Sequence, residues 1–264
     1  MLSFKDIKFL MKNKKARDMQ GLFVAEGPRL VREAPPESVV QVLVSRRFGE
    51  EHPEYLDRLR PGTDVVTDIE EGRFASLSDT RTPQGIIAVV KKPVFDMERV
   101  LGVACPLLMV LESLQDPGNA GTILRTGEAA GVTAVFLTDD SADLYNPKTT
   151  RATMGSVYRV PHFYVPDAAA LLKELERRDI ASYAAHLRGS SEYTDCSYRG
   201  GTAFVIGNEG RGLSEETAQA AGTRIRIPMM GRVESLNAAM ASCVLMFEAQ
   251  RQRRNESAAR KDLS

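Results

Sequence analysis

The sequence predicts an α/β protein, with a mainly parallel sheet in its C-terminal part and a smaller α/β domain before it. Beyond residue 106, short apolar segments alternate with helical segments, which is the pattern of a parallel sheet with crossover helices. Two of these apolar segments run directly into polar, glycine- or proline-containing loops, the places where α/β folds bind ligands. The 264 residues suffice for one large domain or two modest ones, each with its own core.

Short helical and strand patterns alternate in the first ninety or so residues. Apolar spacing predicts helices over residues 5–11 and 28–34, and strands over residues 39–44, 64–67 and 86–90. A proline and several charges then interrupt the pattern. We therefore expect a first domain over residues 1–95 and a linker over residues 96–105.

The remaining residues, 106–264, form the second predicted domain. Its expected strands cover residues 107–111, 134–137, 180–186, 202–206 and 224–227. Its expected helices cover residues 119–130 (with Gly131 as C-cap), residues 168–178, a short stretch from Ser214, and a last stretch from Ser235 to about Arg251. The charged tail from Arg253 is expected to be frayed.

The last predicted helix carries one broad apolar face. The spacing i, i+3, i+4, i+7, i+8, i+11 places these residues together: Leu236, Ala239, Met240, Cys243, Val244 and Phe247. Such a face fits either the core of the domain or a contact with a second subunit.

Composition restricts the partners and the compartment. Lys plus Arg equals Asp plus Glu, 35 against 35, so any basic surface for a nucleic acid must be local. Three scattered cysteines indicate reduced thiols, and the N-terminus lacks an apolar signal core, so we expect a soluble, cytoplasmic protein. The three histidines stand far apart in the sequence, so no metal site is expected.

The two polar loops are the candidate ligand-binding segments. Gly207, Gly210 and Gly212 remove three Cβ atoms, which lets a ligand lie directly against main-chain groups. A second loop follows the strand that ends near Ile227. The alternative for the first loop is an ordinary turn into a helix capped by Ser214.

Three motifs occur in the order typical of one family. They are residues 116–126 (Asp-Pro-Gly-Asn-Ala-Gly-Thr-Ile-Leu-Arg-Thr), residues 207–212 and residues 227–239. Together they resemble the SpoU/TrmH family of RNA ribose methyltransferases in the SPOUT superfamily, from about residue 106 to residue 253. The resemblance implies a deep trefoil knot, S-adenosylmethionine as cofactor, a homodimer, and an RNA-recognition domain in front.

The resemblance also implies the site. The segments matching the family's cofactor loops contain Gly207, Asn208, Gly210, Ile227, Pro228, Met229, Leu236 and Asn237, where backbone atoms are expected to hold the adenosine half. The implied catalytic residues are Arg125, Asn119, Glu209, Ser235 and Asn237. Ser235 has the alternative of capping the last helix.

Arg125 is the residue expected to act directly on the ribose hydroxyl. The matching family arginine is regarded as activating that group, but a guanidinium with a pKa above about 12 is a poor base. We therefore expect Arg125 to orient the hydroxyl or a neighbouring phosphate and to stabilise the developing alkoxide. The alternatives are a perturbed arginine acting as base, and a purely structural ion pair. Asn119 positions the arginine or the ribose, or caps its helix.

Two basic segments are the candidate RNA contacts. The first segment lies on an expected polar loop before a helix and contains Lys12, Lys14, Lys15 and Arg17. The second resembles a family segment and contains Lys148 and Arg151, with Thr153 in place of the usual serine. Such charges are otherwise ordinary solvated surface.

The function expected from the sequence is methylation of a ribose 2′-hydroxyl in RNA. Ribosomal RNA is favoured over transfer RNA because a separate N-terminal recognition domain is typical of the family members that modify rRNA. The alternatives are a tRNA 2′-O-methyltransferase, a base methyltransferase of the same superfamily, and a non-catalytic RNA-binding or ribosome-assembly factor.

Overall fold

The computed structural model describes residues 1–55, 63–187 and 189–261. By their contacts, the residues divide into two compact units. Unit 1 comprises Met1–Val94 and Asp143–Arg159, and unit 2 comprises Phe95–Ala142 and Val160–Ser264. Residues 143–159, expected within the second domain, thus group with the first unit, and the expected linker contains a short helix that packs into the core of unit 2.

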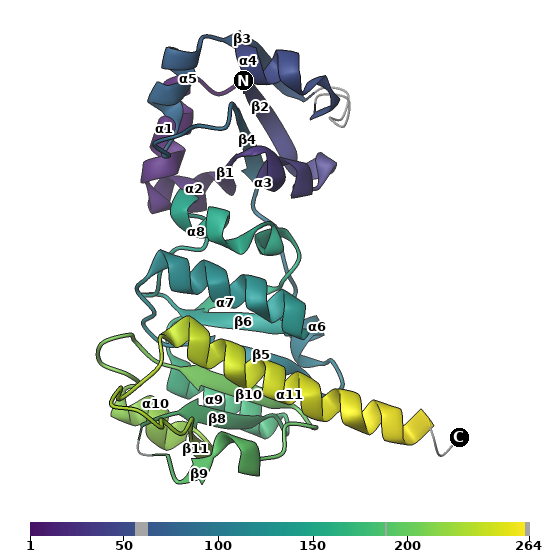
Figure 1. Cartoon of the computed structure of the whole chain (residues 1–264), viewed down its shortest axis with the longest axis vertical. Coiled ribbons are helices and arrows are strands. Elements are labelled where there is room, and N and C mark those ends of the chain that lie inside the picture. Colours follow the sequence, from purple (N-terminus) through teal and green to yellow (C-terminus); the bar gives the residue numbers. More distant parts are fainter. Residues whose placement is uncertain (56–62, 188, 262–264) are drawn as a thin grey trace. The chain divides into compact units, whose positions relative to one another are not determined.

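Unit 1 is built on a four-stranded mixed sheet with the order β1-β4-β2-β3 (Figure 1). Strand β4 pairs antiparallel with β1 and β2, and β3 pairs parallel with β2. The strands are β1 (Leu22–Glu26), β2 (Val39–Ser45), β3 (Asp64–Ile69) and β4 (Ile86–Lys91). The three predicted strands are confirmed, and β1 is an addition.

The helices of unit 1 include both predicted ones. They are α1 (Phe4–Lys12), α2 (Lys14–Gln20), α3 (Pro28–Glu33), α4 (Arg46–Glu51), α5 (Glu71–Leu77) and α8 (Pro147–Thr153), with short 3-10 turns at Pro36–Ser38, Pro53–Tyr55 and Ser156–Tyr158. Helix α1 begins with a capping box between Ser3 and Asp6. The basic segment expected as a loop is largely the helix α2, because the Asn13 side chain accepts a hydrogen bond from Ala16 N and caps it.

Unit 2 contains a seven-stranded sheet (Figure 1), which was predicted to be mainly parallel and in which every strand pairing is parallel. Its order is β7-β6-β5-β10-β8-β11-β9. The strands are β5 (Leu107–Leu111), β6 (Ala134–Thr138), β7 (His162–Val165), β8 (Ala181–Ala185), β9 (Ser191–Glu192), β10 (Thr202–Ile206) and β11 (Thr223–Arg226). All five predicted strands are present; the histidine strand β7 and the two-residue β9 are additions.

Helices cover this sheet. They are α6 (Met97–Leu101), α7 (Pro117–Ala130), α9 (Ala168–Arg177), α10 (Glu215–Ala220) and α11 (Ala238–Lys261), with a 3-10 turn at Tyr193–Asp195. Leucines of α9 and residues of α6 pack on alternate residues of β5 and β10 to form one buried cluster. Helices α7 and α11 lie side by side (Figure 1), and Gln250 Nε2 donates to Ala129 O. Among the helices in the described ranges, none has the length and apolar character needed to cross a lipid bilayer.

Helix α11 differs from its prediction at both ends. It begins at Ala238 rather than at Ser235, because Asn237 Oδ1 accepts hydrogen bonds from Ala239 N and Met240 N and so caps it. It continues to Lys261, through most of the tail that was expected to be frayed. The Arg253 guanidinium helps to anchor this part by donating to carbonyl oxygens of Cys105, Pro106, Tyr198 and Gly200.

The apolar face predicted for α11 is largely not the one that enters the core, and Ala239 is the one helix residue that belongs to both. The buried residues of the helix are Ala238, Ala239, Ser242, Leu245, Met246 and Ala249. Of the predicted face, Met240 is 50% exposed and Phe247 is 40% exposed. Cys243 and Val244 lie between them and are half-buried. The helix therefore presents a second, partly exposed apolar face in addition to its buried one.

Candidate active site

The candidate site lies at the carboxyl ends of the parallel strands of unit 2. Strands β5 and β10 are direct neighbours, with Leu111 opposite Ile206, so the loops that follow them leave the sheet side by side. Strand β11 is not a direct neighbour of β10, because β8 lies between them. Since all of these strands are parallel, the loops after β5, β10 and β11 still leave the sheet at the same edge.

Glu209 joins the loop after β10 to the loop after β5. Its carboxylate accepts hydrogen bonds from Gln115 N (3.0 Å), Asp116 N (2.9 Å) and Asn119 Nδ2 (3.0 Å). Burial by itself raises the pKa of the Glu209 carboxyl. The hydrogen bonds together lower this pKa by more than burial raises it, so the net pKa lies below the ordinary value of a glutamate. Glu209 is therefore ionised at neutral pH, and its stabilising effect is lost only as the pH falls through that lowered pKa.

Asn119 connects this carboxylate to the loop before α11. Its own helix is capped by Asp116, whose Oδ1 accepts from Asn119 N at 2.7 Å, so the alternative of Asn119 as N-cap is wrong. The side-chain amide is therefore directed elsewhere: Nδ2 donates to Glu209 and Oδ1 accepts from Asn237 Nδ2 at 2.9 Å. One hydrogen-bonded chain, Glu209–Asn119–Asn237, thus links the three sequence motifs.

Asn237 both caps α11 and hydrogen-bonds to Asn119, whereas Ser235 does neither. The Asn237 Oδ1 caps α11 while its Nδ2 reaches Asn119. Ser235 is exposed and makes no hydrogen bond with the residues that the structure describes. Its predicted alternative as helix cap is wrong, and it stays available to a ligand.

Arg125 lies on the exposed surface of α7. It follows Asn119 by six residues, which at about 100° per residue turns it roughly 120° away from the Glu209–Asn119–Asn237 chain. Among the described residues, none forms a salt bridge or hydrogen bond with its guanidinium. The predicted alternative of a structural ion pair is therefore not seen, and the group is open to an anionic or hydroxylic ligand.

The glycine loop after β10 is closed by its own backbone. Asn208 N donates to Gly212 O and Gly212 N donates to Asn208 O, at 3.0 and 2.9 Å. The Asn208 side chain ties this loop to the loop that follows β5, because Nδ2 donates to Ser113 O, while Oδ1 accepts from Gly210 N and Arg211 N. A Cβ on Gly207 would lie 2.2 Å from Gly212 C, so glycine is required there for loop closure itself.

The loop after β11 offers main-chain groups that the protein does not use. Within the described part of the chain, residues 227–236 make no hydrogen bond with any other residue. Ile227 and Met229 are half-buried, whereas Pro228 is exposed and Leu236 is 37% exposed. This loop combines open amides and carbonyls with apolar side chains, a combination that suits a ligand with a flat heteroaromatic part.

The predicted RNA contacts all lie in unit 1 and fall into two groups. Lys12, Lys14, Lys15 and Lys148 are exposed. Arg17, by contrast, is buried, donates to Leu10 O and Met11 O, and forms an ion pair with Asp143. Its guanidinium is thus withdrawn from the surface, contrary to expectation. Arg151 is paired with Glu26 (3.3 Å) and Asp79 (3.4 Å) and is committed to these carboxylates.

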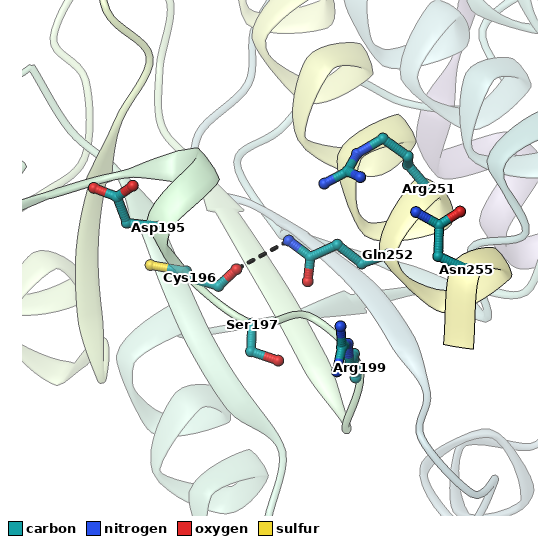
Figure 2. A pocket seen from close by; sticks show the side chains of 7 residues that line it. All are labelled: Asp195, Cys196, Ser197, Arg199, Arg251, Gln252 and Asn255. Carbon is teal, nitrogen blue, oxygen red and sulfur yellow. Dashed lines mark hydrogen bonds between the residues drawn. The ribbon is translucent and has the colours of Figure 1, made fainter. Parts of the chain in front are cut away.

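A separate hollow of about 380 Å³ lies elsewhere in unit 2, between α11 and the segment before β10 (Figure 2). Its lining residues are Asp195, Cys196, Ser197, Arg199, Arg251, Gln252 and Asn255, and Gln252 Nε2 donates to Cys196 O. None of the predicted site residues lines this hollow. Within residues 1–55, 63–187 and 189–261, no group of three or more His, Cys, Asp or Glu side chains is placed to hold a metal ion.

Known proteins resemble this chain in both its N-terminal and its C-terminal part. The SpoU rRNA Methylase family matches residues 106–247, and the MRM3-like substrate binding domain matches residues 4–88. The chain is 33% identical to the 23S rRNA (guanosine(2553)-2'-O)-methyltransferase RlmP of Bacillus subtilis, over 89% of this chain and 90% of that protein. It is 30% identical to the mitochondrial rRNA methyltransferase 3 of Homo sapiens, over 94% of this chain and 72% of that protein.

A solved structure resembles both units. The SpoU methyltransferase AviRb from Streptomyces viridochromogenes, crystallised with the cofactor AdoMet, superimposes with a TM-score of 0.85 at 28% identity. The superposition covers 95% of this chain and 97% of that one. On these matches and on the three motifs joined at the edge of its parallel sheet, the chain belongs to the SpoU rRNA methylase family.

Proposed function

We propose that this protein transfers a methyl group from S-adenosylmethionine to a ribose 2′-hydroxyl of ribosomal RNA. The observation that carries the proposal is the Glu209–Asn119–Asn237 chain, which unites the three family motifs at one sheet edge. The relatives support the reaction and the substrate, since RlmP is named as a 2′-O-methyltransferase of 23S rRNA. The match of residues 4–88 to a substrate-binding domain supports ribosomal over transfer RNA as the target.

The cofactor is proposed to lie between the loops that follow β10 and β11. When bound, S-adenosylmethionine supplies a methyl group that is already activated by its sulfonium. The main-chain groups of residues 227–236, which are not used within the described protein, are the proposed partners of the adenosine half. The side chains of Ile227, Met229 and Leu236 provide apolar contacts beside them. No metal is needed by such a transfer.

The polar residues are proposed to prepare the ribose hydroxyl. Arg125 orients the hydroxyl or an adjacent phosphate and stabilises the developing alkoxide, while the hydroxyl proton passes to solvent water. Glu209 is a weak base because its pKa is lowered, so its proposed role is to fix the orientation of Asn119 rather than to accept the proton. Ser235, which is exposed beside Asn237, is left to contact the substrate. Holding the reacting groups in line can lower the barrier by about 7–11 kcal/mol in favourable cases.

The substrate class is tested by methyl transfer from radiolabelled S-adenosylmethionine to unmodified rRNA and tRNA, supplied separately and together. We expect label in rRNA and little in tRNA at equal nucleotide concentration. Preferential labelling of tRNA would overturn the substrate assignment. Isothermal titration with the cofactor alone accompanies the assay, because failure to bind it would favour a non-catalytic assembly factor.

Gly207 gives a test of the loop that is proposed to face the cofactor. Gly207→Ala is expected to lower the melting temperature and weaken cofactor binding at least about tenfold, because its Cβ would overlap the Gly212 main chain, and such overpacking costs about 1–3 kcal/mol. Calorimetry and cofactor titration measure the two effects. Gly210→Ala is the matched control for stability, since its Cβ would meet only Asn208 Oδ1 at 3.7 Å. Equal melting temperatures for the two variants would contradict the account.

We include a homodimer in the proposal, formed through the exposed apolar face of α11. That face contains Met240, Cys243, Val244 and Phe247, and an apolar stripe of this kind on a helix fits a partner surface. A cytoplasmic location and the deep trefoil knot also remain part of the proposal. The location is supported by three free cysteines, and the knot by family membership.

Charges on this face are expected to separate the subunits. Met240→Asp combined with Phe247→Asp should convert the wild-type dimer to a monomer in analytical ultracentrifugation, because two carboxylates cannot be buried unpaired in an apolar contact. Val103→Asp is the matched control, since Val103 is 45% exposed at another place in unit 2. A wild-type protein that is monomeric at micromolar concentration would refute the dimer.

A further inference from the structure

The exposed face of α1 combines three lysines with an aromatic ring. With about 100° between successive residues, Lys5, Lys8, Phe9 and Lys12 all fall within an arc of roughly 100°. The opposite side of the helix carries Ile7, Leu10 and Met11, which are buried in the core of unit 1. The four outward residues are therefore not required to hold the helix in place, and we refer to them as the α1 face.

Phe9 is unusual in being left open to solvent. Its exposed fraction is 53%, although phenylalanine is normally a core residue. In the described ranges no aromatic ring stacks on Phe9 and no cation lies over it. Phe4 on the same helix is different, because Arg73 lies over its ring at 4.4 Å. The Phe9 ring thus offers an open surface for a planar partner.

The lysines around Phe9 are also open to an anionic ligand. Lys5, Lys8 and Lys12 form no salt bridge with any residue in the part of the chain that the structure describes. The neighbouring carboxylate, Asp6, is turned to the helix cap, where it accepts from Ser3 N and Ser3 Oγ. Residues 1–15 carry five lysines and one aspartate, a local net charge of +4 in a chain whose net charge is zero. The α1 face therefore attracts a polyanion.

We propose that the α1 face binds an unpaired segment of the substrate RNA, with Phe9 stacking on a base and the lysines contacting the flanking phosphates. The proposal rests on the function proposed above and names the part of the molecule that reads single-stranded RNA. A base in a duplex is covered on both sides by its neighbours, so an aromatic ring on a convex helix reaches only unpaired bases. Lysines supply affinity for phosphates without regard to sequence.

Binding of two labelled RNAs tests the stacking directly. One is a hairpin with a ten-nucleotide loop, and the other is a fully paired duplex with the same number of nucleotides. Phe9→Ala is expected to weaken hairpin binding about 5- to 150-fold, the range for loss of one base–aromatic stack, and to change duplex binding less than about twofold. Phe9→Trp should restore hairpin binding because the stacking surface is retained.

Two further variants separate stacking from charge. Val94→Ala removes another exposed apolar side chain of unit 1, which is 95% exposed, and should leave the binding of both RNAs unchanged. Replacing Lys5, Lys8 and Lys12 with Gln should weaken both RNAs and reduce the salt dependence by up to about 0.7 units of slope per lost single-strand contact. Equal losses of hairpin and duplex binding for Phe9→Ala, or no loss for either, would overturn the proposal.

Photochemical crosslinking provides an independent readout of contact. Ultraviolet irradiation of the wild-type protein with the hairpin, followed by trypsin, should yield the peptide Phe9-Leu10-Met11-Lys12 carrying a nucleotide mass. Its absence, with other peptides crosslinked, would place the unpaired base elsewhere. If Phe9→Ala binds and methylates unmodified rRNA like wild type, the proposal for the α1 face fails, while the proposed function still stands. If the wild-type protein transfers no methyl group to rRNA, the proposed function itself fails.

Discussion

Arg125→Ala is expected to reduce methyl transfer to rRNA at least about 100- to 1000-fold, the loss typical of removing one donor that stabilises a developing oxyanion. Affinity for S-adenosylmethionine should stay within a few-fold of wild type, because Arg125 lies on α7 and outside the loops after β10 and β11 that are proposed to hold the cofactor. Single-turnover transfer and calorimetric titration measure the two quantities separately.

The control for Arg125 is another exposed arginine of unit 2. Arg254 lies on α11 and makes no ion pair with the described residues, so Arg254→Ala removes the same chemistry from a place far along another helix. It should leave transfer within about twofold of wild type, since isolated surface substitutions have small effects. Parallel losses of transfer, cofactor affinity and melting temperature for Arg125→Ala would show instead that Arg125 is structural.

Arg17→Ala is expected to destabilise unit 1 by about 3–5 kcal/mol, as breaking one side of a buried ion pair does. The substitution leaves the Asp143 carboxylate, which is 10% exposed, without its partner, and also frees Leu10 O and Met11 O. Urea unfolding followed by circular dichroism measures the loss. Lys15→Ala, an exposed neighbour on α2, should change stability by less than about 0.5 kcal/mol. A loss below about 1 kcal/mol for Arg17→Ala would contradict the buried pair.

Local signals predicted the framework of unit 2 well. Strand β10 has the predicted bounds, and α7 ends at Ala130 with Gly131 as its C-cap, whose φ of 77° explains why glycine follows the helix. Ser214 caps α10 by accepting from Thr217 N, as the sequence predicted for a short helix beginning there. These features depend on neighbouring residues along the chain, so periodicity and cap residues carry the information.

Features that depend on residues far apart in the sequence could not be predicted from local patterns. Arg17 was expected at an RNA surface, but its partner Asp143 is 126 positions away and no local pattern announces the pair. The apolar spacing of α11 did not show which of two apolar faces would be buried, since that depends on packing against α7. The order of strands, with β8 between β10 and β11, also follows from tertiary contacts alone.

The sequence predicted which residues belong to the candidate site better than it predicted how they are arranged. Asn119, Glu209 and Asn237 were selected through motifs, and the structure joins them by hydrogen bonds of 3.0 and 2.9 Å. The backbone amides of Gln115 and Asp116, which hold Glu209, were missed because main-chain donors leave no residue signature. The sequence Asp116-Pro117 did contain a signal for the start of α7, since Pro at the first helical position follows a capping residue.

The position of the transferred methyl group is the most direct test of the account. Unmodified rRNA would be methylated with radiolabelled S-adenosylmethionine and hydrolysed completely in alkali. A ribose 2′-O-methyl group removes the hydroxyl that attacks the neighbouring phosphate, so the label should remain in alkali-stable dinucleotides, and mass spectrometry should identify a 2′-O-methylnucleoside. Label recovered in mononucleotides, as a methylated base, would contradict the account.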